Sequence, residues 1–263
     1  MSECILAATM AGVAQIALNR PAKRNALDRA TIAALCIQLQ RCAEDPGVRV
    51  VQITGAGDVF CAGADLGEMQ AQAQAGEADN LRDAEQLAAM LSILDSLPKP
   101  TLARVNGDGY GGALGILAAC DIVVASDAAK FAFTEVRLGI IPAVISPFVL
   151  GKLGEGAARR YFLTAETLTA ADLKELGLVQ EVVPLAQLDA ACDRITEALL
   201  KGAPGAQAKA KALIRDFAQA AAPKRGAASQ EAAARLAQLR VQPEAQEGFS
   251  AFFSKRKASW RKD

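Results

Sequence analysis

Two glycine-containing turns offer backbone N–H groups to a ligand. Residues 60–66 read FCAGADL and residues 109–113 read GYGGA, and each turn follows a stretch typical of a buried strand. Glycine lets a ligand approach the main chain and leaves amide groups directed outward. Two amides that converge on one oxygen form an oxyanion hole, which stabilises charge developing on a carbonyl oxygen. Taken alone, either turn is explained more simply by the close packing that strand-to-helix connections require.

Proton transfer in this chain has to be carried out without histidine, because the sequence contains none. That absence excludes the Ser/His/Asp and Cys/His nucleophilic arrangements and the most common general base. Glu135, in the stretch FTEV, is the strongest candidate acid or base because its neighbours are apolar. Burial in such surroundings raises the pKa of a carboxyl group toward neutrality. Outside a catalytic context, Glu135 reads more readily as a salt-bridged loop residue than as a catalytic group.

The sequence predicts no metal, nicotinamide or flavin cofactor. Its six cysteines are scattered without a CxxC pair, which argues against a zinc site. The GxxxxGK[ST] phosphate loop is also absent. Unpaired cysteines of this kind are typical of a reducing compartment. With no leader-like N-terminus and no apolar run of about 18 residues, we expect a soluble cytoplasmic protein without a membrane span.

The elements that must position these groups alternate between strand and helix. A hairpin is expected first, followed by buried strands separated by helices, so the pattern predicts parallel crossover units and an α/β fold. From Pro147 onward the chain reads as almost wholly helical, and residues 70–80 read as irregular. The expected division is a β/α core over residues 1–200 and a helical region over 201–263. Strands are expected at 5–8, 13–18, 48–54, 101–105, 122–126 and 178–183, and helices at 28–42, 81–96 and 113–120.

The amino-acid composition and the net charge limit the kinds of partner that the chain can bind. The 263 residues are 52% hydrophobic, and 29 Lys and Arg balance 29 Asp and Glu. A chain of this length and composition buries a large core. Because the net charge is zero, it offers no field of one sign to hold a nucleic-acid backbone, and we expect no nucleic-acid partner.

Several longer motifs occur together along nearly the whole chain. They are LNRPAKRNAL at 18–27, FCAGADL at 60–66, NGDGYGG at 106–112, CDIVVAS at 120–126, FTEVRLGIIP at 133–142 and EGFSAFFSKRKA at 247–258. In this order and spacing the chain resembles the crotonase (enoyl-CoA hydratase/isomerase) superfamily. The resemblance implies a spiral of ββα units with a C-terminal helical trimerisation region, assembled as a homotrimer or a dimer of trimers. It also implies an acyl-CoA thioester substrate, whose carbonyl oxygen would lie between the amides of Ala64 and Gly112.

Glu135 matches the second catalytic glutamate of that family, but the position of the first is held by Gly115. A single glutamate is compatible with a hydratase in which Glu135 and backbone groups position the water, and with a double-bond isomerase. A noncatalytic CoA-binding protein is a third possibility. The stretch after Glu135 is similar to methylglutaconyl-CoA hydratases and related isoprenoid glutaconyl-CoA hydratases. Their substrates carry an extra carboxylate, for which Arg137 is the candidate cation; it is also readable as a structural arginine.

The resemblance further implies the contacts with coenzyme A, which enters as part of the substrate. Cationic side chains at Lys23 and Arg24 suit its phosphates. Lys255, with Phe252 packed nearby, would reach the nucleotide from a neighbouring subunit, although a terminal basic cluster is more often a solvated helix end. The remaining expected contacts are Ala26, Ala62, Gly63, Asp65, Leu66 and Gly111.

Overall fold

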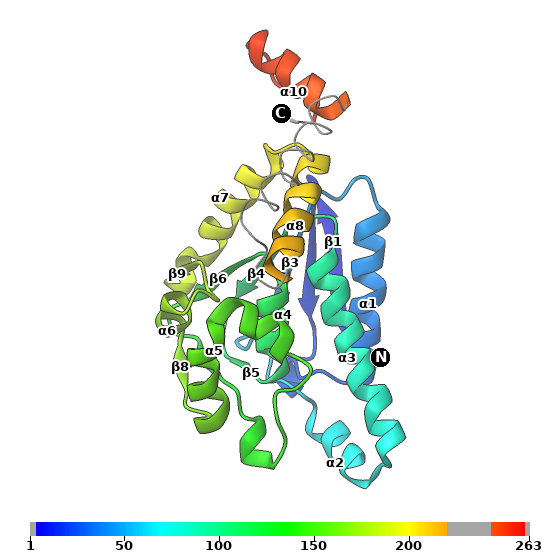
Figure 1. The fold of residues 1–263 in the computed structure, drawn as a ribbon, viewed down its shortest axis with the longest axis vertical. Helices are drawn as coiled ribbons and strands as arrows, with labels where there is room; N and C mark the ends of the chain where they lie inside the picture. Colours follow the sequence, from blue (N-terminus) through cyan, green and yellow to red (C-terminus); the bar gives the residue numbers. More distant parts are fainter. Residues whose placement is uncertain (1–3, 220–242, 261–263) are drawn as a thin grey trace.

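The computed structural model describes residues 4–219 and 243–260 (Figure 1). The strands are β1 (Ile5–Met10), β2 (Val13–Leu18), β3 (Val50–Gly55), β4 (Thr101–Val105), β5 (Gly109–Tyr110), β6 (Ile122–Ser126), β7 (Lys130–Ala132), β8 (Leu168–Thr169) and β9 (Glu181–Val183). The α-helices are α1 (Arg29–Glu44), α2 (Leu66–Gln74), α3 (Glu77–Ser96), α4 (Gly112–Ala119), α5 (Ser146–Thr164), α6 (Ala170–Glu175), α7 (Leu188–Leu200), α8 (Pro204–Gln219) and α10 (Pro243–Phe253). Short 3-10 helices cover Pro21–Lys23, Glu135–Leu138 and Leu185–Gln187.

The larger sheet confirms the predicted α/β architecture. Its strand order is β1-β2-β3-β4-β6-β9, with β1 and β2 antiparallel and the other neighbours parallel. Strand β3, with the sequence VVQITG, is buried along almost its whole length. Parallel strands covered by helices on both faces produce continuous apolar runs of this kind, which is why the sequence predicts them well.

The two faces of this sheet belong to separate apolar clusters. Ala103 and Val123 face the main core, which also contains buried side chains of α1, α3 and α4. Leu102 and Val124 point to the opposite face and pack against Leu188 and other residues of α7. This division follows from the two-residue period of a strand, in which successive side chains alternate between faces.

A second, three-stranded sheet was not expected from the sequence. Strand β7 pairs in parallel with β5 and antiparallel with β8. Because β5 and β8 each contain two residues, neither carries a detectable alternation of polar and apolar residues. This small sheet matters for the site, because it joins the second glycine turn to the segment that leads into Glu135.

Residues 70–80 differ from their prediction. The stretch expected to be irregular contains the end of α2 and the start of α3, with a short break at Ala75 and Gly76. Helix α2 begins where the side chain of Asp65 accepts hydrogen bonds from the amides of Gly67 and Glu68. An N-cap of this kind satisfies amide groups that otherwise lack partners at a helix start. The Ala/Gln composition of the segment is therefore helical rather than loop-like.

Helix α10 lies at the end of the molecule opposite α2, whereas α8 extends toward the middle (Figure 1). The Glu244 carboxylate accepts hydrogen bonds from the amides of Gly205 and Ala206, and thereby connects α10 to the start of α8. Arg49 donates to the carbonyls of Gly202 and Trp260, which connects this region to the core. The part of the region that the structure describes is helical, as the sequence predicts; its role in trimerisation remains a prediction.

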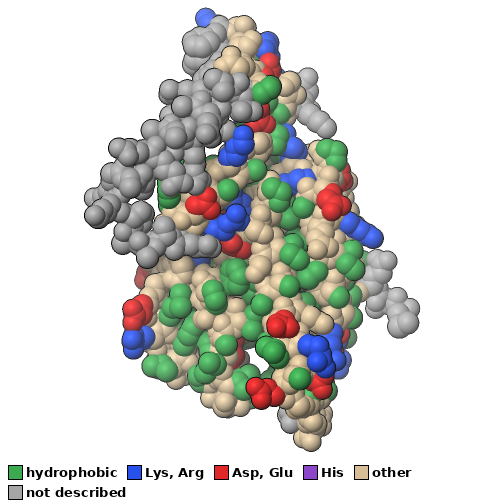
Figure 2. Space-filling model, turned by 45° about the vertical axis from the view of Figure 1, so that its right-hand side comes forward, with side chains coloured by type: hydrophobic (Ala, Val, Ile, Leu, Met, Phe, Trp, Pro, Cys, Tyr) green, Lys and Arg blue, Asp and Glu red, His purple; other side chains and the backbone are tan. Residues whose placement is uncertain are grey.

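Charged side chains are dispersed over the surface. On the face drawn in Figure 2, acidic and basic side chains are interspersed among apolar ones. None of the described helices is both long enough and apolar enough to span a lipid bilayer.

Candidate active site

The two glycine turns pack directly against each other. The amides of Phe60 and Cys61 both donate to the carbonyl of Asp108 at 3.1 Å, and the amide of Tyr110 donates to the Cys61 carbonyl at 3.1 Å. At Gly63, whose φ is +85°, an added Cβ would lie 2.7 Å from the Tyr110 carbonyl oxygen. Glycine is thus required here both by its backbone conformation and by the close approach of the second turn.

The Ala64 amide points away from the strand that holds its segment in place. Leu27 and Ala64 form a parallel bridge, in which the Leu27 amide donates to Gly63 and the Asp65 amide donates to Leu27. Backbone groups of successive residues in an extended chain point to opposite sides. The N–H of Ala64 therefore points away from Leu27.

The Gly112 amide lies at the N-terminus of α4, next to the first turn. Gly111 has a φ of +50° and its amide donates to Ala132, after which α4 begins. Within the described part of the chain, the amides of Ala64 and Gly112 donate no hydrogen bond. A partly accessible pair of unpaired amides, one at a helix N-terminus, suits a developing negative charge on an oxygen.

Glu135 presents its carboxyl group to this pair of turns. The position that a Cβ would take at Gly111 lies 3.3 Å from Glu135 Oε1, so the missing side chain leaves room for the carboxyl group. Glu135 Oε2 is buried without a hydrogen-bond partner in the described structure. Burial raises the pKa of the Glu135 carboxyl above its usual value, although a hydrogen bond from its own amide partly opposes the shift. This is the direction that its apolar neighbours predict.

The segment that carries Glu135 is fixed by the core on one side. Phe133 is fully buried, and its ring packs against that of Phe162 in α5 with centroids 4.8 Å apart. Glu135 then begins a 3-10 helix that ends at Leu138. A rigid support of this kind holds a catalytic group in one orientation.

Gly115, which stands in place of the family's first glutamate, has no room for a side chain. A Cβ added there would lie 2.4 Å from Ile145 Cγ2 and 3.1 Å from Leu91 Cδ1. Ile145 itself is almost completely buried, at 2% exposure. The space that a side chain at position 115 would need is therefore filled by hydrocarbon.

The residues expected to hold coenzyme A cluster around the first turn. Lys23, Arg24 and Leu66 are exposed, with Leu66 at 81%. The amide of Ala62 donates to the Arg24 carbonyl, so these two positions lie side by side. Arg24 also lies 3.6 Å from the Asp108 carboxylate, which offsets part of its charge. Their contacts with coenzyme A stay predictions.

Two of the predicted contacts have an evident structural task. The Asp65 carboxylate caps α2 and accepts from Arg20, and the Ala26 carbonyl accepts from the same guanidinium group. Both residues are buried. The structure therefore places them behind the first turn rather than on its accessible side.

Three further predicted residues lie outside the two glycine turns. Arg137 belongs to the same 3-10 helix as Glu135. One Arg137 nitrogen donates to the Ala165 carbonyl, 2.6 Å away at the end of α5. Phe252 lies in α10 and Lys255 just beyond it, at the opposite end of the molecule from α2 (Figure 1). A contact of Lys255 with the site of a neighbouring copy of the chain stays a prediction.

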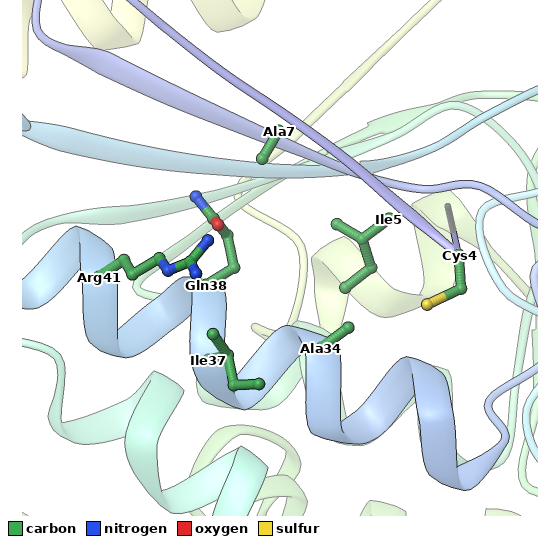
Figure 3. A pocket seen from close by; sticks show the side chains of 7 residues that line it. All are labelled: Cys4, Ile5, Ala7, Ala34, Ile37, Gln38 and Arg41. Atoms are coloured by element: carbon green, nitrogen blue, oxygen red, sulfur yellow. The ribbon is translucent and has the colours of Figure 1, made fainter. Parts of the chain in front are cut away.

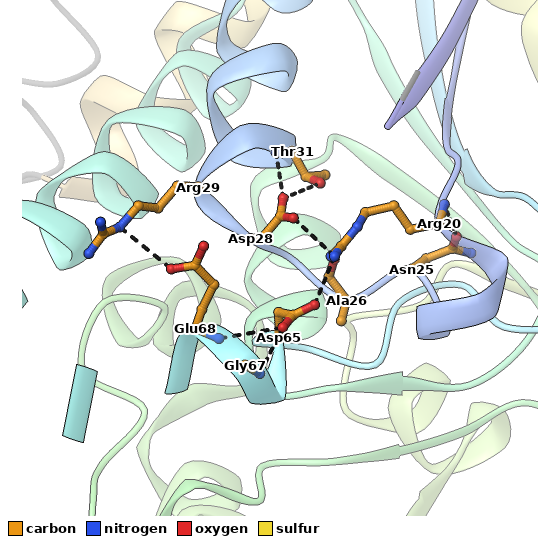
Figure 4. Close-up of polar contacts among 9 residues, drawn as sticks. All are labelled: Arg20, Asn25, Ala26, Asp28, Arg29, Thr31, Asp65, Gly67 and Glu68. Atoms are coloured by element: carbon orange, nitrogen blue, oxygen red, sulfur yellow. Dashed lines mark hydrogen bonds and ion pairs between the residues drawn. The ribbon is translucent and has the colours of Figure 1, made fainter. Parts of the chain in front are cut away.

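Arg20 belongs to the motif at residues 18–27, and the motif alone assigns it no role. Its guanidinium group lies between the carboxylates of Asp28 and Asp65 (Figure 4). The alternation of basic, amide and acidic residues in NRPAKRNALD is the signal that was available. Without the fold, it does not show which of these residues face one another.

Surface hollows among the described residues include the following two. One, of about 470 Å³, lies between β1 and α1 and contains none of the predicted site residues (Figure 3). The other, of about 430 Å³, begins beside Glu135, at Val136. Its lining is mainly apolar and comprises Val136, Ile141, Pro142, Ala143, Ser146, Leu150, Glu155, Ala158, Arg159, Phe162 and Leu163. Among the described residues, no group of three or more His, Cys, Asp and Glu side chains is placed to bind a metal ion.

Comparison with known proteins gives a consistent result. A family model described as enoyl-CoA hydratase/isomerase matches residues 8–263. The 2,3-dehydroadipyl-CoA hydratase of Escherichia coli is 34% identical over 257 residues, which is 97% of each chain. An enoyl-CoA hydratase of Shewanella pealeana is similar in structure, with a TM-score of 0.94, 38% identity and coverage of 98% of this chain and 96% of the other. Pseudomonas aeruginosa AtuE has a TM-score of 0.92 and 33% identity, with coverage of 99% and 100%.

Proposed function

Because the chain belongs to the enoyl-CoA hydratase/isomerase family, we propose that it adds water to the double bond of an α,β-unsaturated acyl-CoA. One observation carries this proposal: the half-buried carboxyl group of Glu135 lies beside Gly111, in the turn whose Gly112 amide, like that of Ala64, donates no hydrogen bond among the described residues. The amides supply a site for a thioester carbonyl oxygen. The carboxyl group supplies a proton carrier next to it.

The proposed reaction needs no cofactor, because one side chain, Glu135, both accepts and returns the proton. The Glu135 carboxylate accepts a proton from water while the hydroxyl oxygen bonds to the β carbon. The electron pair of the double bond moves toward the thioester, and the two amides stabilise the resulting enolate oxygen. Protonated Glu135 then returns the proton to the α carbon. A carboxyl group with a raised pKa is suited to both steps, because it exchanges protons readily near neutral pH.

We further propose a branched or carboxylated substrate, with 3-methylglutaconyl-CoA as the first candidate. Support comes from the motif resemblance and from the E. coli relative, which is named for a dicarboxylic acyl group. The apolar groove beside Val136 suits a branched acyl chain. Arg137 remains the candidate partner for the extra carboxylate, although one of its nitrogens is bonded to Ala165.

A second candidate function is double-bond isomerisation. The packing of Ile145 against Gly115 favours it, because an isomerase moves one proton between two carbons and needs one carboxylate. In that reaction Glu135 would remove a proton from one carbon and deliver it to another, with the same enolate oxygen held between the amides. A CoA-binding protein without turnover is the third candidate.

Mass analysis separates the three functions. The purified chain would be incubated with 3-methylglutaconyl-CoA, with crotonyl-CoA and with a β,γ-unsaturated ester in deuterated water. Gain of one water on the branched ester supports the proposal. Migration of the double bond without gain of water would instead establish the isomerase. Binding of all three esters without any change in them would establish the noncatalytic reading.

A further inference from the structure

We propose that Arg20 is a positioning residue for the oxyanion hole, in that its guanidinium group fixes the orientation of the Ala64 amide. The inference rests on the proposed function, since it concerns the same amide. The Arg20 side chain bonds to Ala26, Asp65 and Asp28, and not to Glu135 or to the amides of Ala64 and Gly112. Its action would therefore pass through the strand that carries Ala64.

Two backbone hydrogen bonds with Leu27 hold the segment that contains Ala64. Leu27 bonds to Gly63 at 2.7 Å and Asp65 bonds to Leu27 at 3.0 Å, which fixes the direction of the Ala64 peptide between them. These bonds hold only while the two short extended segments keep their register. An isolated bridge between short segments is weak unless side chains reinforce it.

Arg20 provides that reinforcement on both segments at once. One nitrogen donates to the Ala26 carbonyl at 2.6 Å, beside Leu27. Another donates to Asp65 Oδ2 at 2.9 Å, beside Ala64. The same nitrogen lies 3.0 Å from Asp28 Oδ2. The planar fork of arginine makes several bonds in fixed directions, which a lysine ammonium does not reproduce.

Both carboxylates that Arg20 joins are also helix caps. Asp65 Oδ1 accepts from the Gly67 amide at 2.8 Å, and Asp28 Oδ1 accepts from the Thr31 amide at 2.8 Å (Figure 4). Each aspartate is therefore held at both oxygens, and α1, α2 and the Ala64 segment form one unit. Burial by itself would raise the pKa of Asp65, but its bonds from Arg20 and the α2 amides lower it overall.

Partial burial strengthens the contact between Arg20 and Asp65. The side chains of Arg20 and Asp65 are 19% and 10% exposed, so solvent screens their interaction less than it screens a surface pair. Without Arg20, the carboxylates of Asp28 and Asp65 would face each other with their charges uncompensated. We expect Asp65 to turn away, and the adjacent Ala64 peptide to turn with it.

The test uses Arg20→Met, with Arg29→Met as its matched control. Arg29 begins α1 and pairs with Asp83 at 2.6 Å and with Glu68, but it contacts neither strand of the Ala64 bridge. Both variants should unfold at lower temperature. Only Arg20→Met should lower kcat, by roughly tenfold to a hundredfold, as expected for a misplaced oxyanion donor, with KM little changed.

A spectroscopic measurement reports the amide directly. In the Glu135→Gln background, crotonyl-CoA with an isotope label at its thioester carbonyl would be bound and its C=O stretching frequency recorded. Polarisation by the two amides lowers that frequency. Arg20→Met should return it toward the solution value, and Arg29→Met should not. If Arg20→Met does not fold, Asp65→Asn takes its place, because it keeps a cap acceptor and loses the charge facing Arg20.

The possible outcomes separate this inference from the proposed function. An unchanged frequency and kcat in the Arg20→Met or Asp65→Asn variant would overturn the role of Arg20. A normal frequency in the parent background would overturn the oxyanion hole, and both proposals with it. A lowered frequency that depends on Arg20, in a protein that hydrates none of the tested esters, would support the role of Arg20 and reject the hydratase.

Discussion

Ile145 occupies the space in front of Gly115: its Cγ2 atom lies 2.4 Å from where a Cβ at position 115 would be. The two residues come from separate elements, α4 and the residue preceding α5, and both are buried. A side chain at 115 and the present Ile145 cannot occupy their positions together. The packing of the core therefore excludes a carboxylate at position 115. Introducing one would require a change at Ile145 as well as at Gly115.

This packing predicts the effect of a single methyl group. Gly115→Ala should destabilise the protein by roughly 1–3 kcal/mol through overpacking, despite the higher helix propensity of alanine. Gly151→Ala, on α5, is the control, because an added Cβ there meets nothing within 4 Å. Combining Gly115→Ala with Ile145→Ala should cost less than the sum of the two single changes. Additive costs in denaturant unfolding would show that the two sites do not compete for space.

Removing the Glu135 carboxyl group should abolish turnover without loss of binding. Glu135→Gln keeps the size of the side chain but cannot carry the proton, so we expect kcat to fall by roughly a thousandfold. Binding of the CoA ester, measured by calorimetry, should be nearly unchanged. Glu181→Gln is the control, since Glu181 pairs with Arg194 and lines neither of the two hollows. Similar turnover in wild type and Glu135→Gln would remove Glu135 from the mechanism.

The raised pKa of Glu135 also predicts how stability depends on pH. Burial raises the folded-state pKa above the usual value of 4.5, so the folded protein favours the protonated form. That favourable contribution is complete below the unfolded-state pKa and is lost as pH rises through the folded-state pKa. Glu135→Gln should therefore gain melting temperature relative to wild type as pH increases, with the smallest difference in acid. Parallel curves for the two proteins would show that Glu135 titrates normally.

Two glycine-to-alanine variants separate the effect of the close approach of the two turns from the effect of backbone strain. Gly63→Ala and Gly139→Ala both place a side chain at positive φ, but an added Cβ at Gly139 meets nothing within 4 Å. We expect Gly139→Ala to cost about 1 kcal/mol through strain alone. Gly63→Ala should cost more and should also lower kcat, because it pushes the Tyr110 carbonyl and the Gly112 amide away. Equal losses of stability and activity in the two variants would contradict the proposed contact between the turns.

Assembly is the remaining prediction. Several large apolar side chains are exposed to solvent in the single chain, among them Ile141, Leu163 and Ile214. Exposed apolar patches mark surfaces that bind another protein chain. Light scattering should give a mass three or six times that of one chain. A monomer at all concentrations would reject the assignment of Lys255 to a neighbouring subunit's site.

The sequence predicted the regular elements where local signals are strong. Strand β4 and strand β6 match their expected bounds, because each is a short apolar run closed by polar residues. Helix α1 begins at the Asp28 cap that the sequence shows. Helix α2 was missed because its start depends on Asp65, whose capping role is invisible among neighbouring glycines. Strands β5 and β8 are too short to carry a pattern.

The sequence by itself determined the chemistry that is available: no histidine, two glycine turns and a glutamate among apolar neighbours. These follow from residue types and short-range order, which need no fold to be read. Only the tertiary structure decided which groups meet. It placed Arg20 against Asp65, 45 residues away, and Ile145 against Gly115. Contacts of this kind depend on how helices and strands pack, and the packing is set by the whole core rather than by any one segment.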